Sequence, residues 1–160
     1  METKKILIAL DNNAGAQKVA AYGYELSQAL HAHTILVHVT SGSTYYSSLN
    51  YSPIMGFDTF SNLDVEQTNA VDELKRTAQD YLDNAKLDLG DETIETILKE
   101  GDYAENILQT AKEVKADIIV VGTHSRKGLD KVLLRSVAEK VLHHTTIPLF
   151  IIPVKPAEED

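Results

Sequence analysis

The sequence predicts an α/β fold in which helices cover both faces of one parallel sheet. Five short runs of aliphatic residues are spread along the 160-residue chain, and four of them are almost uninterrupted. Such runs are typical of strands that are buried on both faces, as in a parallel sheet. The segments between them carry apolar residues three and four positions apart, which is the pattern of an amphipathic helix. This alternation indicates right-handed crossovers and therefore an open, doubly wound sheet.

The five predicted strands share a short length and a high content of isoleucine, valine and leucine. They are expected at Ile6–Leu10, Ile35–Val39, Ile94–Leu98, Ile118–Val121 and Ile147–Ile152. The third strand alternates more than the others, because Glu95 and Thr96 interrupt it. Alternation is typical of a strand with a less buried face, so we place this strand nearer an edge of the sheet.

Four helices are predicted between the strands, each with one apolar stripe that faces the sheet. The stripes are Val19, Tyr22, Leu26 and Leu30; Val71, Leu74, Ala78, Leu82 and Ala85; Ile107, Leu108, Ala111 and Val114; and Leu134, Val137, Ala138 and Val141. The last helix has a defined start, because Ser136 and Glu139 form a capping-box sequence.

The chain is expected to form one domain over residues 1–154, because it contains no linker and no internal repeat. One segment, Ser41–Asn62, breaks the rhythm, since it is rich in serine and aromatic residues and contains Pro53 and Gly56. A patternless stretch of this length is unusual inside a compact domain. We therefore expect a surface excursion there, and a frayed, charged tail over residues 155–160.

Composition narrows the function classes. The net charge of −9 argues against nucleic acid and anionic membranes as partners. The absence of cysteine excludes disulfides and thiolate metal sites and favours a reducing compartment. No apolar run approaches the ~18 residues of a membrane span, and the N-terminal segment lacks the features of a signal peptide. These properties indicate a cytoplasmic protein.

Residues that carry catalysis or bind metals do not form a recognisable motif. The sequence contains no HExxH, GxSxG, GxGxxG or GxxxxGK[ST] pattern. His38 lies in a predicted buried strand and is expected to be a hydrogen-bonded core residue. His31 and His33, like His143 and His144, are expected at helix ends, where cations interact favourably with the dipole. We therefore predict no catalytic residue and no metal site.

The carboxyl edge of the sheet is the expected place for a ligand, at the point where the strand order reverses. The first predicted strand leads into Asp11, and the fourth leads into Gly122. If these strands are neighbours, Asp11 can accept hydrogen bonds from ribose hydroxyls, and the helix start after Gly122 can bind phosphate. The loop between Gly122 and that helix carries four basic residues, Arg126, Lys127, Lys131 and Arg135. Each residue also has a structural explanation: Asp11 as a turn or cap residue, Gly122 as a strand exit, and the basic side chains as solvated surface.

Several segments together resemble the universal stress protein family over essentially the full length. They are the opening KKILIALD, the VHV of the second strand and the block DIIVVGTHSRKGLDKVLLRSVAEKVLHHTTIPLFIIP. The resemblance implies a Rossmann-like, five-stranded parallel sheet of order 3-2-1-4-5 with four helices. It also implies a homodimer that pairs through the fifth strand, here Leu149, Phe150, Ile151 and Ile152.

ATP-binding members of that family carry the pattern G-x2-G-x9-G-[S/T]. Laid on this sequence, the pattern falls on Gly122, Ser125, Arg135 and Ser136, so its spacing is kept but two of its three glycines are replaced. The large side chain of Arg135 either fills the phosphate pocket or binds phosphate as a bidentate ligand. The resemblance implies this nucleotide-binding set: Ala9, Asp11, Val39, Gly122, Ser125, Arg135, Ser136 and Val137.

Two function classes follow. The first is a cytoplasmic stress-response regulator that binds ATP, ADP or AMP, with Mg²⁺ only if ATP binds. The second is a stress protein that binds no nucleotide and acts through protein contacts, for which the aromatic segment Tyr45–Phe60 is one candidate surface. A metabolic enzyme is disfavoured, because no residue resembles a dedicated catalytic base.

Overall fold

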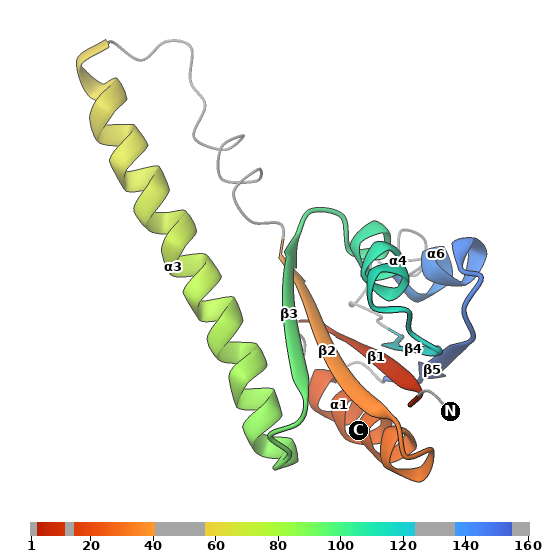
Figure 1. Cartoon of the computed structure of the whole chain (residues 1–160). Coiled ribbons are helices and arrows are strands. Elements are labelled where there is room, and N and C mark those ends of the chain that lie inside the picture. The colour runs from red at the N-terminus through yellow and green to blue at the C-terminus, as the bar shows by residue number, and fades with distance from the viewer. Residues whose placement is uncertain (1–2, 12–14, 41–56, 124–136, 155–160) are drawn as a thin grey trace.

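The computed structural model describes residues 3–11, 15–40, 57–123 and 137–154, and within residues 57–71 it describes the backbone and only the side chain of Ala70. A single five-stranded sheet forms the centre of this part of the chain (Figure 1). Its strands are β1 (Lys5–Leu10), β2 (His33–Thr40), β3 (Glu95–Glu100), β4 (Ile118–Gly122) and β5 (Leu149–Ile152). They follow the order β3-β2-β1-β4-β5, and every neighbouring pair is parallel. The predicted fold class and strand order are confirmed, as is the edge position of the third strand.

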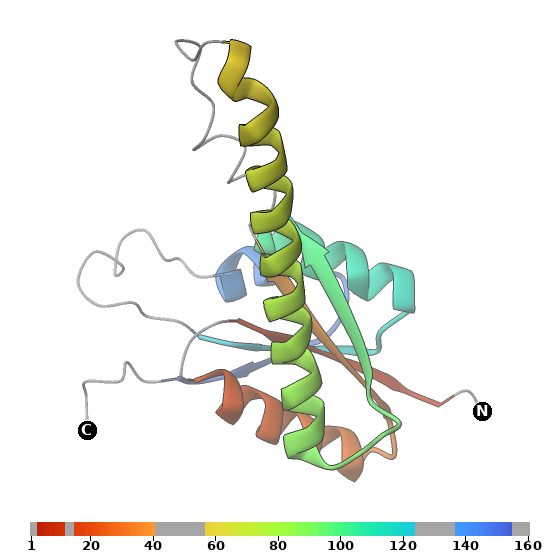
Figure 2. The same ribbon diagram turned by 90° about the vertical axis from the view of Figure 1, so that its left-hand side faces the viewer.

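Four helices cover the sheet, two on each face. They are α1 (Ala16–Ala29), α3 (Phe57–Leu89), α4 (Tyr103–Val114) and α6 (Val137–His144). In Figure 2 the sheet separates α1 from α4 and α6. The two apolar clusters agree with this arrangement, since one contains side chains from α4 and α6 and the other contains side chains from α1 and α3.

The strand β1 shows why uninterrupted apolar runs predicted the fold. Leu7 belongs to the cluster beneath α4 and α6, whereas Ile6 and Ile8 belong to the cluster beneath α1 and α3. All three side chains are fully buried. Because successive side chains of a strand point to opposite faces, a strand covered on both sides must be apolar at every position.

The helix α3 is longer than the sequence pattern predicted. It begins at Phe57 and has 33 residues, about 50 Å at 1.5 Å per residue, and its first half extends beyond the sheet in Figure 1. Residues 57–62 of the expected excursion Ser41–Asn62 therefore belong to this helix, and its remainder, 41–56, lies outside the described residues. No glycine or proline interrupts the chain from Phe57 until Gly90, whose φ of 71° ends the helix.

Of the four histidines predicted at helix ends, the structure places three there. His143 and His144 lie in the last turn of α6, as predicted. His31 has a φ of 53° just after α1, but His33 is the first residue of β2, so its placement at a helix end is wrong. The physical reason is pairing with the sheet, because His33 pairs with Lys5 of β1 and its Nε2 lies 3.6 Å from Glu95 Oε2.

Candidate functional site

A narrow cleft opens where the carboxyl ends of β1, β2 and β4 meet the first turns of α4 and α6. Its empty volume is about 350 Å³, part of which is open to solvent, and only about 20 Å³ admits the centre of a water molecule. Its described lining consists of Ala9, Leu10, Asp11, Val37, Val39, Tyr103, Ile107, Val121, Gly122 and Val137. The cleft therefore lies at the reversal of strand order, where ligands of open α/β sheets bind.

The floor of this cleft is aliphatic. Ala9 of β1 and Val39 of β2 belong to or pack against the cluster beneath α4 and α6, and Val39 is almost fully buried. Small apolar side chains without charged groups form a surface that suits the face of a planar ring better than an ion. The floor thus contains Ala9 and Val39, two residues of the nucleotide-binding set that the family resemblance implies.

Asp11 is the one acidic residue in the described lining. It follows Leu10, the last residue of β1, and is half-buried. A carboxylate there can accept hydrogen bonds from two neighbouring hydroxyl groups. The backbone at this residue is also fixed, because the Tyr81 hydroxyl donates a 2.5 Å hydrogen bond to the Asp11 carbonyl oxygen.

Gly122 ends β4 at the cleft, and packing explains why it is a glycine. A Cβ at this position would lie 2.6 Å from Val19 Cγ2 and 3.2 Å from Val154 Cγ2. Its φ is not in the left-handed region. No side chain fits between the sheet and α1, and the backbone of Gly122 is left accessible on the cleft side. The structure thus adds a packing role to the strand-exit role inferred from the sequence.

The first residue of α6, Val137, closes the cleft beside β4. Backbone N–H groups at a helix start carry partial positive charge and favour an anion. The described part of α6 begins at Val137, and the predicted cap residue Ser136 lies outside the described residues. Ser125, Arg135, Ser136 and the other basic residues of the loop lie outside the described residues.

The structure brings together those predicted site residues that it describes. Ala9, Asp11, Val39, Gly122 and Val137 all line the one cleft. Sequence reasoning missed Tyr103 and Ile107 of α4, which also line it. The sequence contains a signal for the start of α4. In the structure Asp102 caps this helix by accepting a 2.9 Å hydrogen bond from the Glu105 N–H. An Asp-x-x-Glu sequence directly after the third strand places a helix start at the same edge of the sheet.

Two side chains, His38 and Tyr81, contact the backbone at the end of β1 from the face opposite the cleft. His38 is fully buried, and its Nδ1 lies 2.8 Å from the Leu10 carbonyl oxygen. Its ring centroid is 5.0 Å from that of Tyr81, with a 58° angle between the planes. Burial lowers the pKa of His38 and raises the pKa of Tyr81, so both side chains are neutral near pH 7. His38 is a hydrogen-bonded core residue, as predicted.

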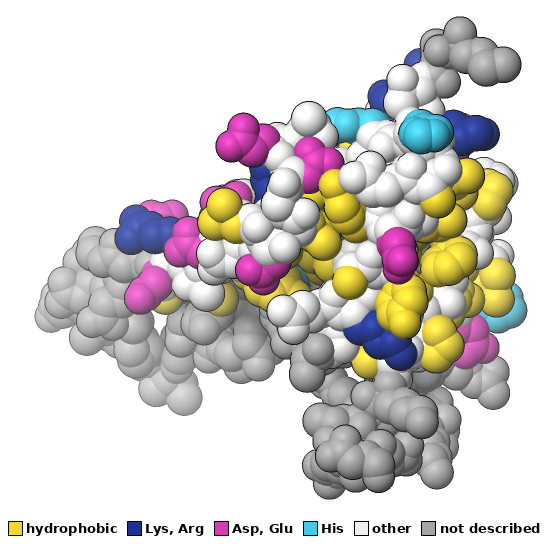
Figure 3. Space-filling model, turned by 90° about the horizontal axis from the view of Figure 1, so that it is seen from below, with side chains coloured by type: hydrophobic (Ala, Val, Ile, Leu, Met, Phe, Trp, Pro, Cys, Tyr) yellow, Lys and Arg dark blue, Asp and Glu magenta, His cyan; other side chains and the backbone are white. Residues whose placement is uncertain are grey.

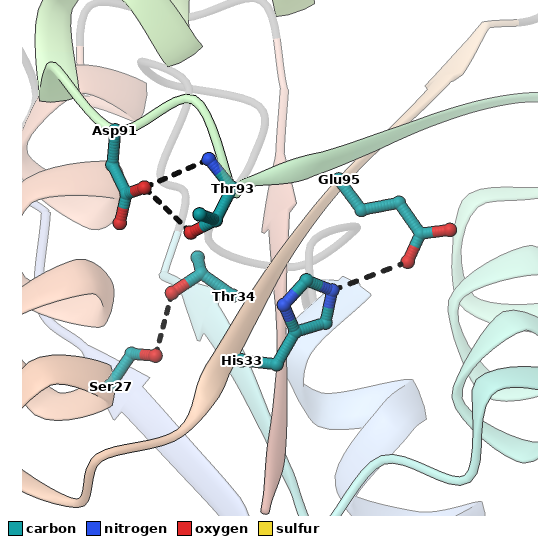
Figure 4. A network of polar contacts seen from close by, with 6 residues as sticks. All are labelled: Ser27, His33, Thr34, Asp91, Thr93 and Glu95. Carbon is teal, nitrogen blue, oxygen red and sulfur yellow. Dashed lines mark hydrogen bonds and ion pairs between the residues drawn. The ribbon is translucent and has the colours of Figure 1, made fainter. Parts of the chain in front are cut away.

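A second polar network lies at the amino edge of the sheet, away from the cleft (Figure 4). Asp91 accepts hydrogen bonds from the backbone and the hydroxyl of Thr93 and from Tyr24, and these hydrogen bonds lower its pKa. Ser27 of α1 and Thr34 of β2 share a buried hydroxyl hydrogen bond of 2.6 Å. These contacts join α1 to the start of β2 and to the turn before β3.

Among the described residues no group of acidic or histidine side chains is arranged to hold a metal ion.

Comparison with known sequences gives the family. The universal stress protein family matches residues 2–153. The chain is 28% identical over 158 residues to the universal stress protein MJ0531 of Methanocaldococcus jannaschii, covering 98% of this chain and 85% of the relative. It is 29% identical over 154 residues to the universal stress protein YxiE of Bacillus subtilis, covering 92% and 97%.

Solved structures share the fold. The hypothetical protein MJ0577 matches with a TM-score of 0.72 at 23% identity, covering 98% of this chain and 100% of its own. A universal stress protein in complex with cAMP matches at 0.58 with 19% identity, covering 95% and 98%. The universal stress protein of Archaeoglobus fulgidus in complex with dAMP matches at 0.52 with 17% identity, covering 96% and 98%. Since the family match spans nearly the whole sequence, the chain belongs to the universal stress protein family.

Proposed function

We propose that this protein is a stress-response regulator that binds an adenine nucleotide in the cleft between β1 and β4. The observation that carries the proposal is the composition of one cleft at the reversal of strand order. An aliphatic floor, one carboxylate and the start of a helix lie around the same space. These are the groups that a base, a ribose and a phosphate require. The cAMP and dAMP complexes of two proteins with this fold support the same ligand class.

In this proposal each part of the nucleotide has a partner. The adenine ring lies on Ala9 and Val39, and the ribose hydroxyls donate to Asp11. The phosphates lie above the backbone of Gly122 and Val137, and the sequence between these two residues contains Ser125, Arg135 and Ser136. Mg²⁺ accompanies the ligand only when it is ATP. No residue of the described lining is placed as a dedicated base, so the proposed role is binding and signalling rather than hydrolysis.

Entry of the nucleotide requires side chains to move. The 20 Å³ open to a water centre is far smaller than the roughly 300 Å³ of a small ligand site. Tyr103 has the largest side chain of the described lining, and it is half-buried on the first turn of α4. We infer that this side chain turns outward when adenine enters.

We propose that the working form is a cytoplasmic homodimer, and the edge strand β5 supports the dimer. Phe150 is 41% exposed and Ile151 is 38% exposed, although both lie in a strand. The β4 side of β5 is paired, and no other strand of the described sheet pairs with its outer side. The two side chains point to opposite faces, and a second copy that pairs with this outer edge would extend the sheet and reduce the exposure of both.

The cleft is narrow, and this favours one second candidate function. In that candidate the protein binds no nucleotide and acts through contacts with another protein. The two candidates differ in a direct measurement. Calorimetric titration of the purified protein with AMP, ADP and ATP gives micromolar dissociation constants under the first candidate. Dissociation constants of a millimolar or weaker for all three nucleotides would refute it and leave the second.

Variants locate the binding site. Asp11→Asn removes the charge that accepts from the ribose, and we expect about tenfold to 100-fold weaker binding. Asp83→Asn is the matched control, because Asp83 is exposed on α3 and hydrogen-bonds only Gln79 among the described residues. Arg135→Gly decides the role of the arginine, since a gain in affinity shows that it blocks the pocket and a loss shows that it binds phosphate. Equal affinities for Asp11→Asn and the wild type would contradict the placement of the ribose.

A further inference from the structure

We infer that His38 and Tyr81 are positioning residues that hold the end of β1, and with it Asp11, from the face opposite the cleft. The inference rests on the proposed function, because it concerns the residue proposed to bind the ribose. It assigns a role to two side chains that do not line the cleft. The two hydrogen bonds to Leu10 and Asp11 are called the carbonyl clamp below.

The clamp lies where β1 is still paired with β2 but no longer paired with β4. On the β2 side the pairing of β1 continues to Leu10 and His38. On the β4 side the pairing ends two residues earlier, at Ile8 and Val120. The last part of β1 therefore lacks a strand partner toward β4 in the described sheet. The carbonyl of Leu10, the last residue of β1, accepts a hydrogen bond from His38, and the next carbonyl, that of Asp11, accepts one from Tyr81.

The two hydrogen bonds determine the tautomer of His38 and the donor role of the Tyr81 hydroxyl. A carbonyl oxygen only accepts, so His38 must carry its proton on Nδ1, and the Tyr81 hydroxyl must donate. The lowered pKa of His38 and the raised pKa of Tyr81 keep both donors neutral. The clamp therefore adds no charge beneath the cleft.

Tyr81 packs against the core on one side and faces a hollow on the other. A hollow that is open to solvent lies between α1 and α3. About 460 Å³ of it admits the centre of a water molecule, against about 20 Å³ of the cleft, and Leu10, Ala20, Tyr81, Ala85 and Leu89 are among the residues that line it. The Tyr81 ring is thus packed against His38 but open toward this hollow. Figure 3 shows the face on which α1 lies, with hydrophobic side chains exposed among scattered charges. On the open side the ring has little packing, so the bond to the Asp11 carbonyl adds to the ordering of both groups.

The position of Asp11 matters for binding because a carboxylate must meet its ligand at hydrogen-bond distance. When the carbonyl is released, the residue samples positions in which its carboxylate is misplaced, and ordering it again weakens binding. A second-layer contact of this kind usually changes affinity less than the contact that it supports.

The test uses the full-length chain with AMP as the ligand. Tyr81→Phe removes only the donor hydroxyl, and we expect about threefold to tenfold weaker AMP binding by calorimetry. Tyr24→Phe is the matched control, because the Tyr24 hydroxyl bonds Asp91 at the amino edge of the sheet, and its AMP affinity should equal that of the wild type. For His38, the variant His38→Leu should weaken binding, and His38→Asn, which retains a donor, should recover it. A purely structural role would lower the melting temperature in all these variants without this pattern of affinities.

A second readout needs no ligand. In the nucleotide-free protein, Tyr81→Phe should shift the ¹³C resonance of the Asp11 carbonyl, and Tyr24→Phe should not. An unshifted resonance, or equal AMP affinity of Tyr81→Phe and the wild type, would overturn the clamp while the proposed function stands. Absence of AMP, ADP and ATP binding by the wild type would overturn the proposed function and the role of the clamp with it.

Discussion

The substitution Gly122→Ala tests whether packing, rather than backbone conformation, requires a glycine at the end of β4. The new Cβ would lie 2.6 Å from Val19 Cγ2, whereas carbon atoms in contact are about 3.5–4.0 Å apart. Val19 is 4% exposed on α1, so its methyl group cannot turn away into solvent. The helix or the strand end must therefore shift by close to 1 Å. Overpacking of this kind costs about 1–3 kcal/mol of unfolding free energy.

Urea denaturation measures that cost. With a slope of about 2 kcal/mol per molar urea, the midpoint of Gly122→Ala should fall by about 0.5–1.5 M. Gly90→Ala is the control for conformation alone, because Gly90 has a φ of 71° and no atom lies within 4 Å of its Cβ position. Its cost should arise from the backbone and amount to about 1 kcal/mol.

The double variant Val19→Ala/Gly122→Ala separates the clash from every other effect. Val19→Ala alone removes buried methyl groups and should cost about 1.5 kcal/mol. In the double variant the clash is absent, so its cost should be close to that of Val19→Ala alone and below the sum of the two single costs. Additive costs, or an unchanged midpoint for Gly122→Ala, would refute the packing explanation.

Three further predictions concern single side chains. Thr110 is fully buried on α4, and its hydroxyl has no hydrogen-bond partner within the described residues, so Thr110→Val should raise the unfolding free energy by about 1 kcal/mol, as measured in urea. Asp102→Ala removes the N-cap of α4 and should lower it by about 1 kcal/mol, whereas Asp102→Asn should retain most of the cap. Burial holds the pKa of His38 below its ordinary value, so as the pH falls below about 6.5 the unfolded chain takes up a proton that the folded chain does not, and stability should fall. His38→Asn should reduce that slope between pH 7.5 and 5.5, and an equal slope would contradict the assignment.

The strands were predictable because their cause is local. A run such as Ile6–Leu10 is apolar at every position because both faces of β1 are covered, and this pattern is visible in the sequence alone. The strand order came from the family resemblance, since the same alternation of strands and helices fits several orders. The start of α3 was missed because Phe57–Asn62 resembles a loop in composition, although it contains no residue that stops a helix.

The candidate site was predictable only in part, for a related physical reason. Asp11 and Gly122 could be singled out because each directly follows an apolar strand. The role of Tyr81 could not, because its partner is a backbone oxygen 70 positions away, and a backbone oxygen leaves no trace in the choice of residue at that position. Gly122 was recognised, but the reason for it was not, since Val19 approaches it only after α1 has packed on the sheet.

In the proposed complex, both faces of the sheet therefore influence what the cleft binds. The side chains that meet the ligand in the proposed complex lie on the α4 and α6 face, and sequence motifs describe that face. The position of the two strand ends is set from the α1 and α3 face, where Val19 excludes a side chain at Gly122 and Tyr81 holds the carbonyl of Asp11. Consider a relative that has the same residues at the positions of Asp11 and Gly122 but a different residue at the position of Val19 or Tyr81. Its site residues are the same, but the backbone that carries them is placed differently. Its affinity for a nucleotide should then follow the residues of α1 and α3 as well as those of the motif.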